Sequence, residues 1–168
     1  MSLTQLRNLG IVANADIATT KLGAGAVLQV VQATTTTQTS ITSVTWTDST
    51  LTASITPSST ANKILVLVNQ HFNIFRTAGT GYAGGSIRLV RGSTTIYSGN
   101  SNFEKYAEVG GGTSVNFYDY FSLTYLDSPS STSSLTYKTQ QRSYDAADRA
   151  MTQPNSTQSS ITLIEIKG

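Results

Sequence analysis

The sequence contains no cysteine and a single histidine, and only 12% of its residues are charged. The lack of cysteine excludes disulfide bonds, thiolate catalysis and cysteine-ligated zinc, and it fits synthesis in a reducing compartment. The charged share is about half that of an ordinary globular protein. The formal net charge is +2 and the basic residues are scattered, so we expect no nucleic-acid partner.

Long apolar runs are also missing. No run approaches the length of a membrane span, and the N-terminus lacks the basic region and the continuous apolar region of a signal peptide. We therefore expect a protein that is made in a cytoplasm and does not insert into a membrane.

Residues suited to catalysis are sparse. His71 ends the longest apolar run, where a lone histidine favours packing or hydrogen bonding, and no Ser-His-acid set can be assembled around it. The carboxylate pairs that are close in sequence, Glu104 with Glu108 and Asp145 with Asp148, are interpreted as loop charges. We predict no catalytic residue, no metal site and no cofactor.

Two kinds of segment invite comparison with a phosphate site. GTGYAGG (79–85) lacks the Lys-Ser/Thr pair and the following helix of a phosphate loop, so we interpret it as a glycine-rich turn. The glycines at 110–112 are expected to allow positive φ in a wide loop. Arg76, Arg88 and Arg91 are interpreted as solvated strand ends, with phosphate binding as the alternative.

What the sequence has in quantity is hydroxyl groups, because Ser and Thr make up roughly three residues in ten. Thr suits the pleated strand and Ser suits turns, which favours a β protein. The 168 residues fit one domain with a real core plus a short extension.

Short β-branched or aromatic runs alternate with turn clusters from residue 26 onward, as in a sandwich or barrel. We predict about eight strands, at residues 26–33, 52–56, 63–75, 86–92, 94–99, 113–127, 134–140 and 160–168. The connecting loops are predicted at residues 56–62, 77–85, 108–113 and 126–134.

Alternation within residues 113–127 separates a core face from an outer face. The core face carries Val115, Phe117, Phe121, Leu123 and Tyr125, and the outer face carries Asn116, Tyr118, Tyr120, Ser122 and Thr124. Residues 64–68 and 161–166 are apolar on both faces. A sandwich whose sheets each expose one face to water would instead carry polar residues on that outer face. Either loops or a second subunit cover the outer faces, and we favour the subunit.

The N-terminal segment, residues 1–25, differs from the β domain at 26–168. Leucines recur at helical spacing, but so short a helix is marginal alone and needs a surface to dock against. We predict a particle-docking segment followed by a hinge at residues 19–25, and an unstructured tail is the alternative. The predicted docking residues are Leu3, Leu6, Leu9 and Ile11.

Several tyrosines fall in or beside predicted loops, where exposed rings can stack on a sugar or fill a partner's pocket. Core or interface packing is the alternative for the same residues. The candidate ligand-binding aromatics are Tyr82, Tyr97, Tyr106 and Tyr144.

Five stretches of the chain resemble the jelly-roll domains of tailed-bacteriophage virion proteins, such as tail-fibre tips, head fibres and capsid decoration proteins. They are KLGAGAVLQVVQ (21–32), TPSSTANKILVLVNQHF (56–72), GSIRLVRGSTTIYSG (85–99), FSLTYLDSPSSTSSLTYKTQ (121–140) and SSITLIEIKG (159–168). The resemblance covers nearly everything after residue 20, and no long collagen-like or coiled-coil stalk precedes it, unlike in a full tail fibre. It implies an all-β antiparallel jelly-roll sandwich, trimeric and non-enzymatic, on a particle surface.

The leading hypothesis is therefore a homotrimeric capsid decoration (cement) or head-fibre protein, located in the virion and made in the host cytoplasm. Its expected partners are its own copies and the major capsid protein or another virion protein. The alternative is a receptor-binding tail-fibre tip that engages host glycans. A polysaccharide-cleaving tailspike ranks lower, because no carboxylate pair is presented on a repeating β scaffold.

Overall fold

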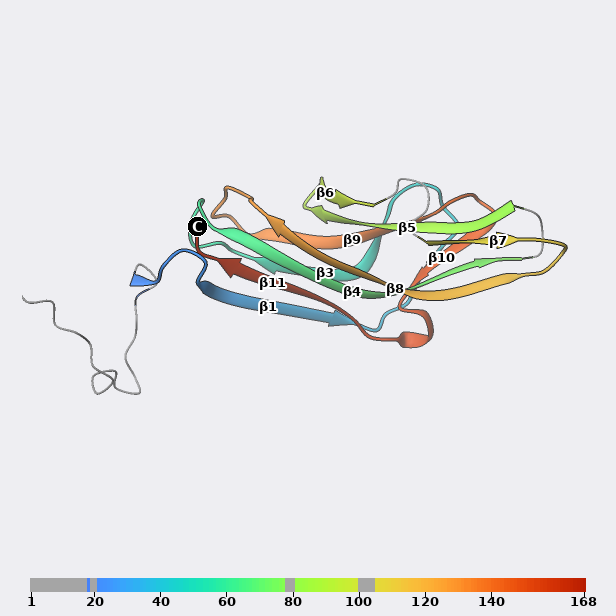
Figure 1. Ribbon diagram of the computed structural model, residues 1–168, viewed down its shortest axis with the longest axis horizontal. Coiled ribbons are helices and arrows are strands. Elements are labelled where there is room, and N and C mark those ends of the chain that lie inside the picture. The colour runs from blue at the N-terminus through green and yellow to red at the C-terminus, as the bar shows by residue number, and fades with distance from the viewer. Residues whose placement is uncertain (1–17, 19–20, 78–80, 100–104) are drawn as a thin grey trace, which may run out of the picture.

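Two antiparallel β-sheets pack face to face in the computed structural model, which describes residues 18, 21–77, 81–99 and 105–168. The strands are β1 (Val27–Thr35), β2 (Thr39–Ile41), β3 (Thr47–Ile55), β4 (Lys63–Arg76), β5 (Gly81–Arg91), β6 (Thr94–Ser98), β7 (Lys105–Val109), β8 (Val115–Asp127), β9 (Leu135–Ser143), β10 (Asp148–Thr152) and β11 (Ser159–Ile166). A 3-10 turn, η2 (Pro154–Ser156), precedes β11. In Figure 1, β5, β6 and β9 lie above β1, β4, β8 and β11.

The strand order is that of a jelly roll. Sheet A runs β1-β11-β4-β8 and sheet B runs β3-β9-β5-β6. The chain passes from one sheet to the other at every connection between these eight strands except the β5–β6 hairpin, so each sheet pairs strands that are distant in sequence. The predicted all-β jelly-roll sandwich is confirmed, and all eight predicted strands are present.

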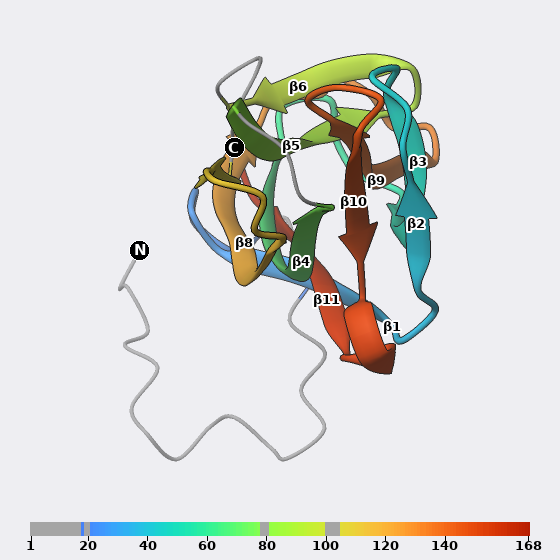
Figure 2. The ribbon, with the colours of Figure 1, turned by 90° about the vertical axis from the view of Figure 1, so that its right-hand side faces the viewer.

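Three further strands were missed in the sequence. β10 continues the edge of sheet A beyond β11 by pairing with the second half of β4, and β2 pairs with β10. β7 pairs with the first half of β5. Figure 1 places β7 and β10 toward one end of the sandwich, and Figure 2 looks at that end, with β2 and β10 side by side. The additions lengthen both sheets.

The glycine-rich segment 79–85 was predicted to be a turn, and this is wrong for residues 81–85, which begin β5. Gly85 explains why glycine is needed in a strand here. A Cβ atom at this position would lie 2.9 Å from the Phe72 ring and 3.1 Å from the backbone oxygen of Arg142. The loop at 110–112 was predicted correctly, since Gly111 and Gly112 have φ of 60° and 80°.

The core lies between the inner faces of the two sheets. Alternation along β8 was assigned in the correct phase, because Phe121 is buried and Val115, Leu123 and Tyr125 pack against the core. Phe117 is a correction, since 40% of it is exposed. Its side of the strand is as predicted, but β8 is an edge strand within the described ranges, and an edge position leaves the ring partly uncovered.

A buried carboxylate holds the end of the sandwich where β1 and β11 meet. Glu165 accepts hydrogen bonds from the Gln29 side chain at 2.6 Å, the Asn62 side chain at 2.6 Å and the Ser58 backbone N–H at 2.6 Å. Burial alone would raise the pKa of Glu165, but these hydrogen bonds together hold it below its ordinary value. The loop before β4 is thereby tied to β1 and β11.

Candidate interaction surfaces

The outward face of sheet A carries an apolar row that crosses four strands. Val30 of β1 lies opposite Ile164 of β11, Ile164 lies opposite Leu65 of β4, and Leu65 lies opposite Leu126 of β8. Val30 is 58% exposed and Leu126 is 47% exposed. The two apolar faces predicted for residues 64–68 and 161–166 are therefore present, and the outer one forms a continuous surface stripe.

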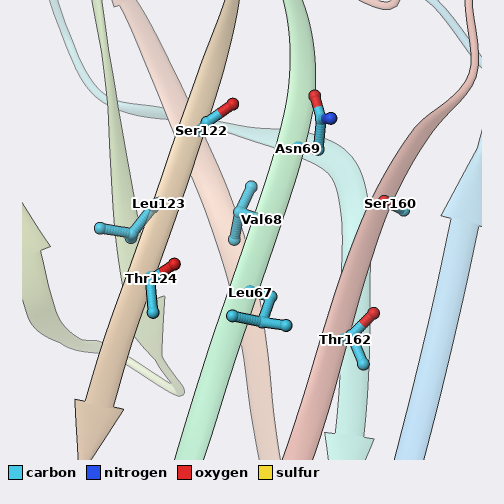
Figure 3. A pocket seen from close by; sticks show the side chains of 8 residues that line it. All are labelled: Leu67, Val68, Asn69, Ser122, Leu123, Thr124, Ser160 and Thr162. Atoms are coloured by element: carbon cyan, nitrogen blue, oxygen red, sulfur yellow. The ribbon is translucent and has the colours of Figure 1, made fainter.

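Two hydroxyl-rich rows follow the apolar row along the same strands. They are Gln32, Thr162, Leu67 and Thr124, and then Thr34, Ser160, Asn69 and Ser122. A shallow hollow of about 400 Å³ lies over these rows, and Figure 3 shows the side chains of β4, β8 and β11 that line it. None of the twelve side chains in the three rows is charged. This part of the surface therefore does not repel a partner of either charge.

An aromatic group occupies the same face farther along β4. The His71 and Tyr120 rings stack with centroids 4.7 Å apart, and Tyr118 lies 6.0 Å from His71. Burial lowers the pKa of His71, and the nearby Asp119 carboxylate opposes that shift. The histidine packs against rings, as predicted.

Three of the four predicted ligand-binding tyrosines come together on the outward face of sheet B. Tyr106 of β7 lies opposite Gly84 of β5, and Tyr144 donates its backbone N–H to the Gly84 carbonyl on the other side. Tyr82 lies two residues before Gly84, and its ring meets the Tyr106 ring edge-on at 5.9 Å. Tyr82, Tyr106 and Tyr144 are 46%, 58% and 40% exposed.

Tyr97, the fourth candidate, was predicted to be an exposed ligand-binding residue, but its ring is partly buried. Its ring lies 6.3 Å from the rings of both Phe121 and Tyr125, and it packs against the core. Tyr97 lies opposite Leu89 in the β5–β6 hairpin, on the inward side of sheet B. Strand register, which turn composition alone does not reveal, decides this orientation.

An ion cluster around the buried Asp148 supports the backbone beside these tyrosines. Arg76 pairs with Asp145 at 2.8 Å and with Asp148 at 3.1 Å, and it also donates to the Tyr82 carbonyl at 3.1 Å. Asp148 accepts the Gly84 backbone N–H at 3.1 Å. Burial raises the pKa of Asp148, while the hydrogen bond from Arg76 lowers the pKa of Asp145.

Several charged residues were therefore misassigned from the sequence. Asp148 is fully buried in β10, so its interpretation as a loop charge is wrong. Arg76 and Arg91 are not merely solvated strand ends, because Arg76 pairs as above and Arg91 pairs with the buried Asp127 at 2.6 Å. Sequence spacing gave no sign of these pairs, whose members lie 36 to 72 residues apart.

The predicted docking residues Leu3, Leu6, Leu9 and Ile11 lie outside the residues that the structure describes. Of the segment predicted to be a hinge, the structure describes residues 21–25, where Gly25 has φ of 85° and donates its N–H to the Lys167 carbonyl at 2.8 Å. Within the described ranges, no three His, Asp or Glu side chains gather in a way that could hold a metal ion. No helix in this part of the chain is long and apolar enough to cross a membrane.

Comparison with protein-family models gives no match, and comparison with curated proteins gives none either. Among solved structures, the chain is similar to the infectious bursal disease virus VP2 subviral particle, with 15% identity and a TM-score of 0.34. That match covers 85% of this chain and 38% of the VP2 chain. The jelly-roll assignment therefore rests on the strand pairing described above.

Proposed function

We propose that this protein is a structural component of a virion surface, a homotrimeric capsid decoration or head-fibre protein of a tailed bacteriophage, with no enzymatic role. The observation that carries the proposal is the set of three uncharged rows on the outer face of sheet A, with the apolar row of Val30, Ile164, Leu65 and Leu126. The resemblance of five sequence blocks to virion jelly rolls supports the setting.

The size of this face suits a stable interface between copies. The outer face of sheet A along all 14 residues of β4 measures roughly 900 Å², at about 3.3 Å per residue and about 4.8 Å between four strands. The uncharged rows cover only residues 65–69 of β4, so an interface of standard size also includes the His71 and Tyr120 end of this face. A stable interface buries about 800 Å² per partner. The uncharged rows of three copies can meet around a threefold axis without like-charge repulsion, which supports self-association.

The first test is the mass of the purified chain in solution. Light scattering should give three times 17.9 kDa, and a mass of 17.9 kDa would contradict the proposed trimer. The second test concerns particle attachment through residues 1–20. Protein that lacks these residues should bind stripped particles with lower occupancy than the full-length chain, because the proposed docking leucines are removed. Equal occupancy would place the docking surface on the jelly roll.

The second candidate function is a receptor-binding fibre tip. The convergence of Tyr82, Tyr106 and Tyr144 on the outer face of sheet B favours it. Copy number in purified particles separates the two candidates, since a decoration protein should be present in hundreds of copies and a fibre tip in a few trimers.

A further inference from the structure

We propose that the outer face of sheet B binds an acidic oligosaccharide, one whose sugar rings carry carboxylates. The inference rests on the second candidate function, receptor binding, and specifies the chemistry of its ligand. Tyr82, Tyr106 and Tyr144 provide the stacking surface, and Arg88 and Arg142 beside Trp46 provide the positive charge.

The arginine end of this surface is built around the only tryptophan of the chain. The guanidinium carbon of Arg88 lies 4.6 Å from the Trp46 ring centroid, and that of Arg142 lies 4.9 Å from it. Arg88 also donates to the Gln140 side chain at 2.7 Å. Two guanidinium groups are thus held against one ring, which restricts their rotamers before a ligand arrives.

Neither arginine forms an ion pair within the part of the chain that the structure describes. The nearest acid to Arg88, Asp48, is occupied by Lys138 at 2.5 Å and by Gln140 at 2.6 Å. Burial, and then the charge of Arg142, lowers the pKa of Arg88. Two like charges held together with no carboxylate bound to either make a place that an anion stabilises.

The arginines and the tyrosines form one continuous surface. Alternation along β5 puts Tyr82, Gly84, Ser86 and Arg88 on the same side, and Arg142 lies opposite Ser86. From Tyr82 to Arg88 the surface is about 20 Å long, at about 3.4 Å per residue. Exposed Tyr rings lie at one end and guanidinium groups at the other, with Glu108 opposite Tyr82 at the end away from the arginines.

The ring end is supported by the ion cluster beneath it. Asp148 holds the Gly84 N–H and Arg76 holds the Tyr82 carbonyl, so side chains of sheet A hold in place the backbone that carries the rings. Large flat rings on a supported strand bury ligand surface at low cost in conformational entropy. The CH face of one sugar ring can pack on such a surface while the carboxylate of a sugar farther along the chain reaches the arginines, whereas a polyglutamate peptide has no ring to place on the tyrosines.

The experiment is a titration of the full-length protein, followed by the fluorescence of Trp46 and by calorimetry. The probes are tetragalacturonic acid, its fully methyl-esterified form and a tetraglutamate peptide. We expect the acid to change the Trp46 emission and to bind at least tenfold more tightly than the ester or the peptide. Arg142→Gln should remove the preference for acid over ester, and Tyr106→Ala should weaken the binding of both sugars.

Lys63→Gln is the matched control, because it removes the same charge from an exposed site at the start of β4 and should leave binding unchanged. Thermal unfolding of each variant is measured to check that the fold is retained. Equal affinity for acid and ester would overturn the acidic class but leave the receptor-binding candidate standing. Binding of the peptide more tightly than the acidic sugar would overturn the assignment to a saccharide. If no probe binds, both the acidic class and the saccharide assignment are overturned. The trimer and the particle role are tested separately by mass and occupancy.

Discussion

The two outer faces of this sandwich obey the same alternation but differ in chemistry. The outer face of sheet A presents three rows without a single charge, bordered by exposed Val30 and Leu126. The outer face of sheet B presents Tyr82, Tyr106 and Tyr144 beside two arginines. Because both faces rest on one core, the difference teaches that the outward residues can specify different partners without changing the fold.

The largest effect should come from a charge placed on the sheet A face. Val30 and Tyr106 are both 58% exposed, so they form a matched pair on opposite faces. Val30→Asp should reduce the mass from three times 17.9 kDa to 17.9 kDa, because an unpaired carboxylate would be buried in the interface. Tyr106→Asp should leave the mass unchanged. If both variants remain trimers, the association surface lies elsewhere.

The next effect compares two phenylalanines of β8 that point to the same side but differ in burial. Phe121→Ala should lower the free energy of unfolding by about 3–5 kcal/mol, because the ring is 3% exposed and its loss opens a cavity. Phe117→Ala, on the same side of β8 but 40% exposed, should cost less than about 1 kcal/mol. Chemical denaturation measures both. Similar losses would show that Phe117 is covered in the assembled protein.

Salt should separate the two faces. Association through the uncharged rows of sheet A depends on hydrophobic burial, so the trimer should persist in 1 M sodium sulfate or sodium chloride. Binding of tetragalacturonic acid to sheet B should weaken in 1 M sodium chloride, where the Debye length is about 3 Å. Light scattering and calorimetry on one sample check both results. A trimer that dissociates in salt would point to an electrostatic interface instead.

The smallest effect concerns pH and the buried Glu165. Its pKa in the folded protein lies below its ordinary value of 4.5, so the ionised carboxylate contributes stability above that pH. The contribution should be lost as the pH falls through the folded value. Glu165→Gln should reduce this acid-induced loss in unfolding measurements between pH 6 and pH 2. Glu108→Gln, at an exposed site, is the control and should retain the wild-type profile.

The strands of the jelly roll were predictable because each carries enough apolar residues to show its periodicity. β2 has three residues, and β10 reads DRAMT, so neither contains a pattern that a sequence can display. Both form because the second half of β4 leaves an edge beyond the end of β11. Their pairing partner, not their composition, makes them strands.

The interaction surfaces were predicted in part. Tyr82, Tyr106 and Tyr144 were singled out because they are aromatic and close to loops, and the structure brings them together. Tyr97 had the same local signal but faces the core. Trp46 and Arg142 were missed, although a single tryptophan in 168 residues was an available signal. Their contact depends on the pairing of β3, which begins just after Trp46, with β9, which is far away in the chain.

By itself, the sequence determined the sheet class, the eight main strands and the side of β8 that faces the core, because these follow from local composition and a period of two residues. Only the tertiary structure decided that Asp148 would be buried against Arg76, that Tyr97 would turn inward, and that two arginines would meet over Trp46. Each of these depends on the register between strands that are distant in sequence. Such register is set when the two sheets pack, since a shift of one residue would reverse every side chain.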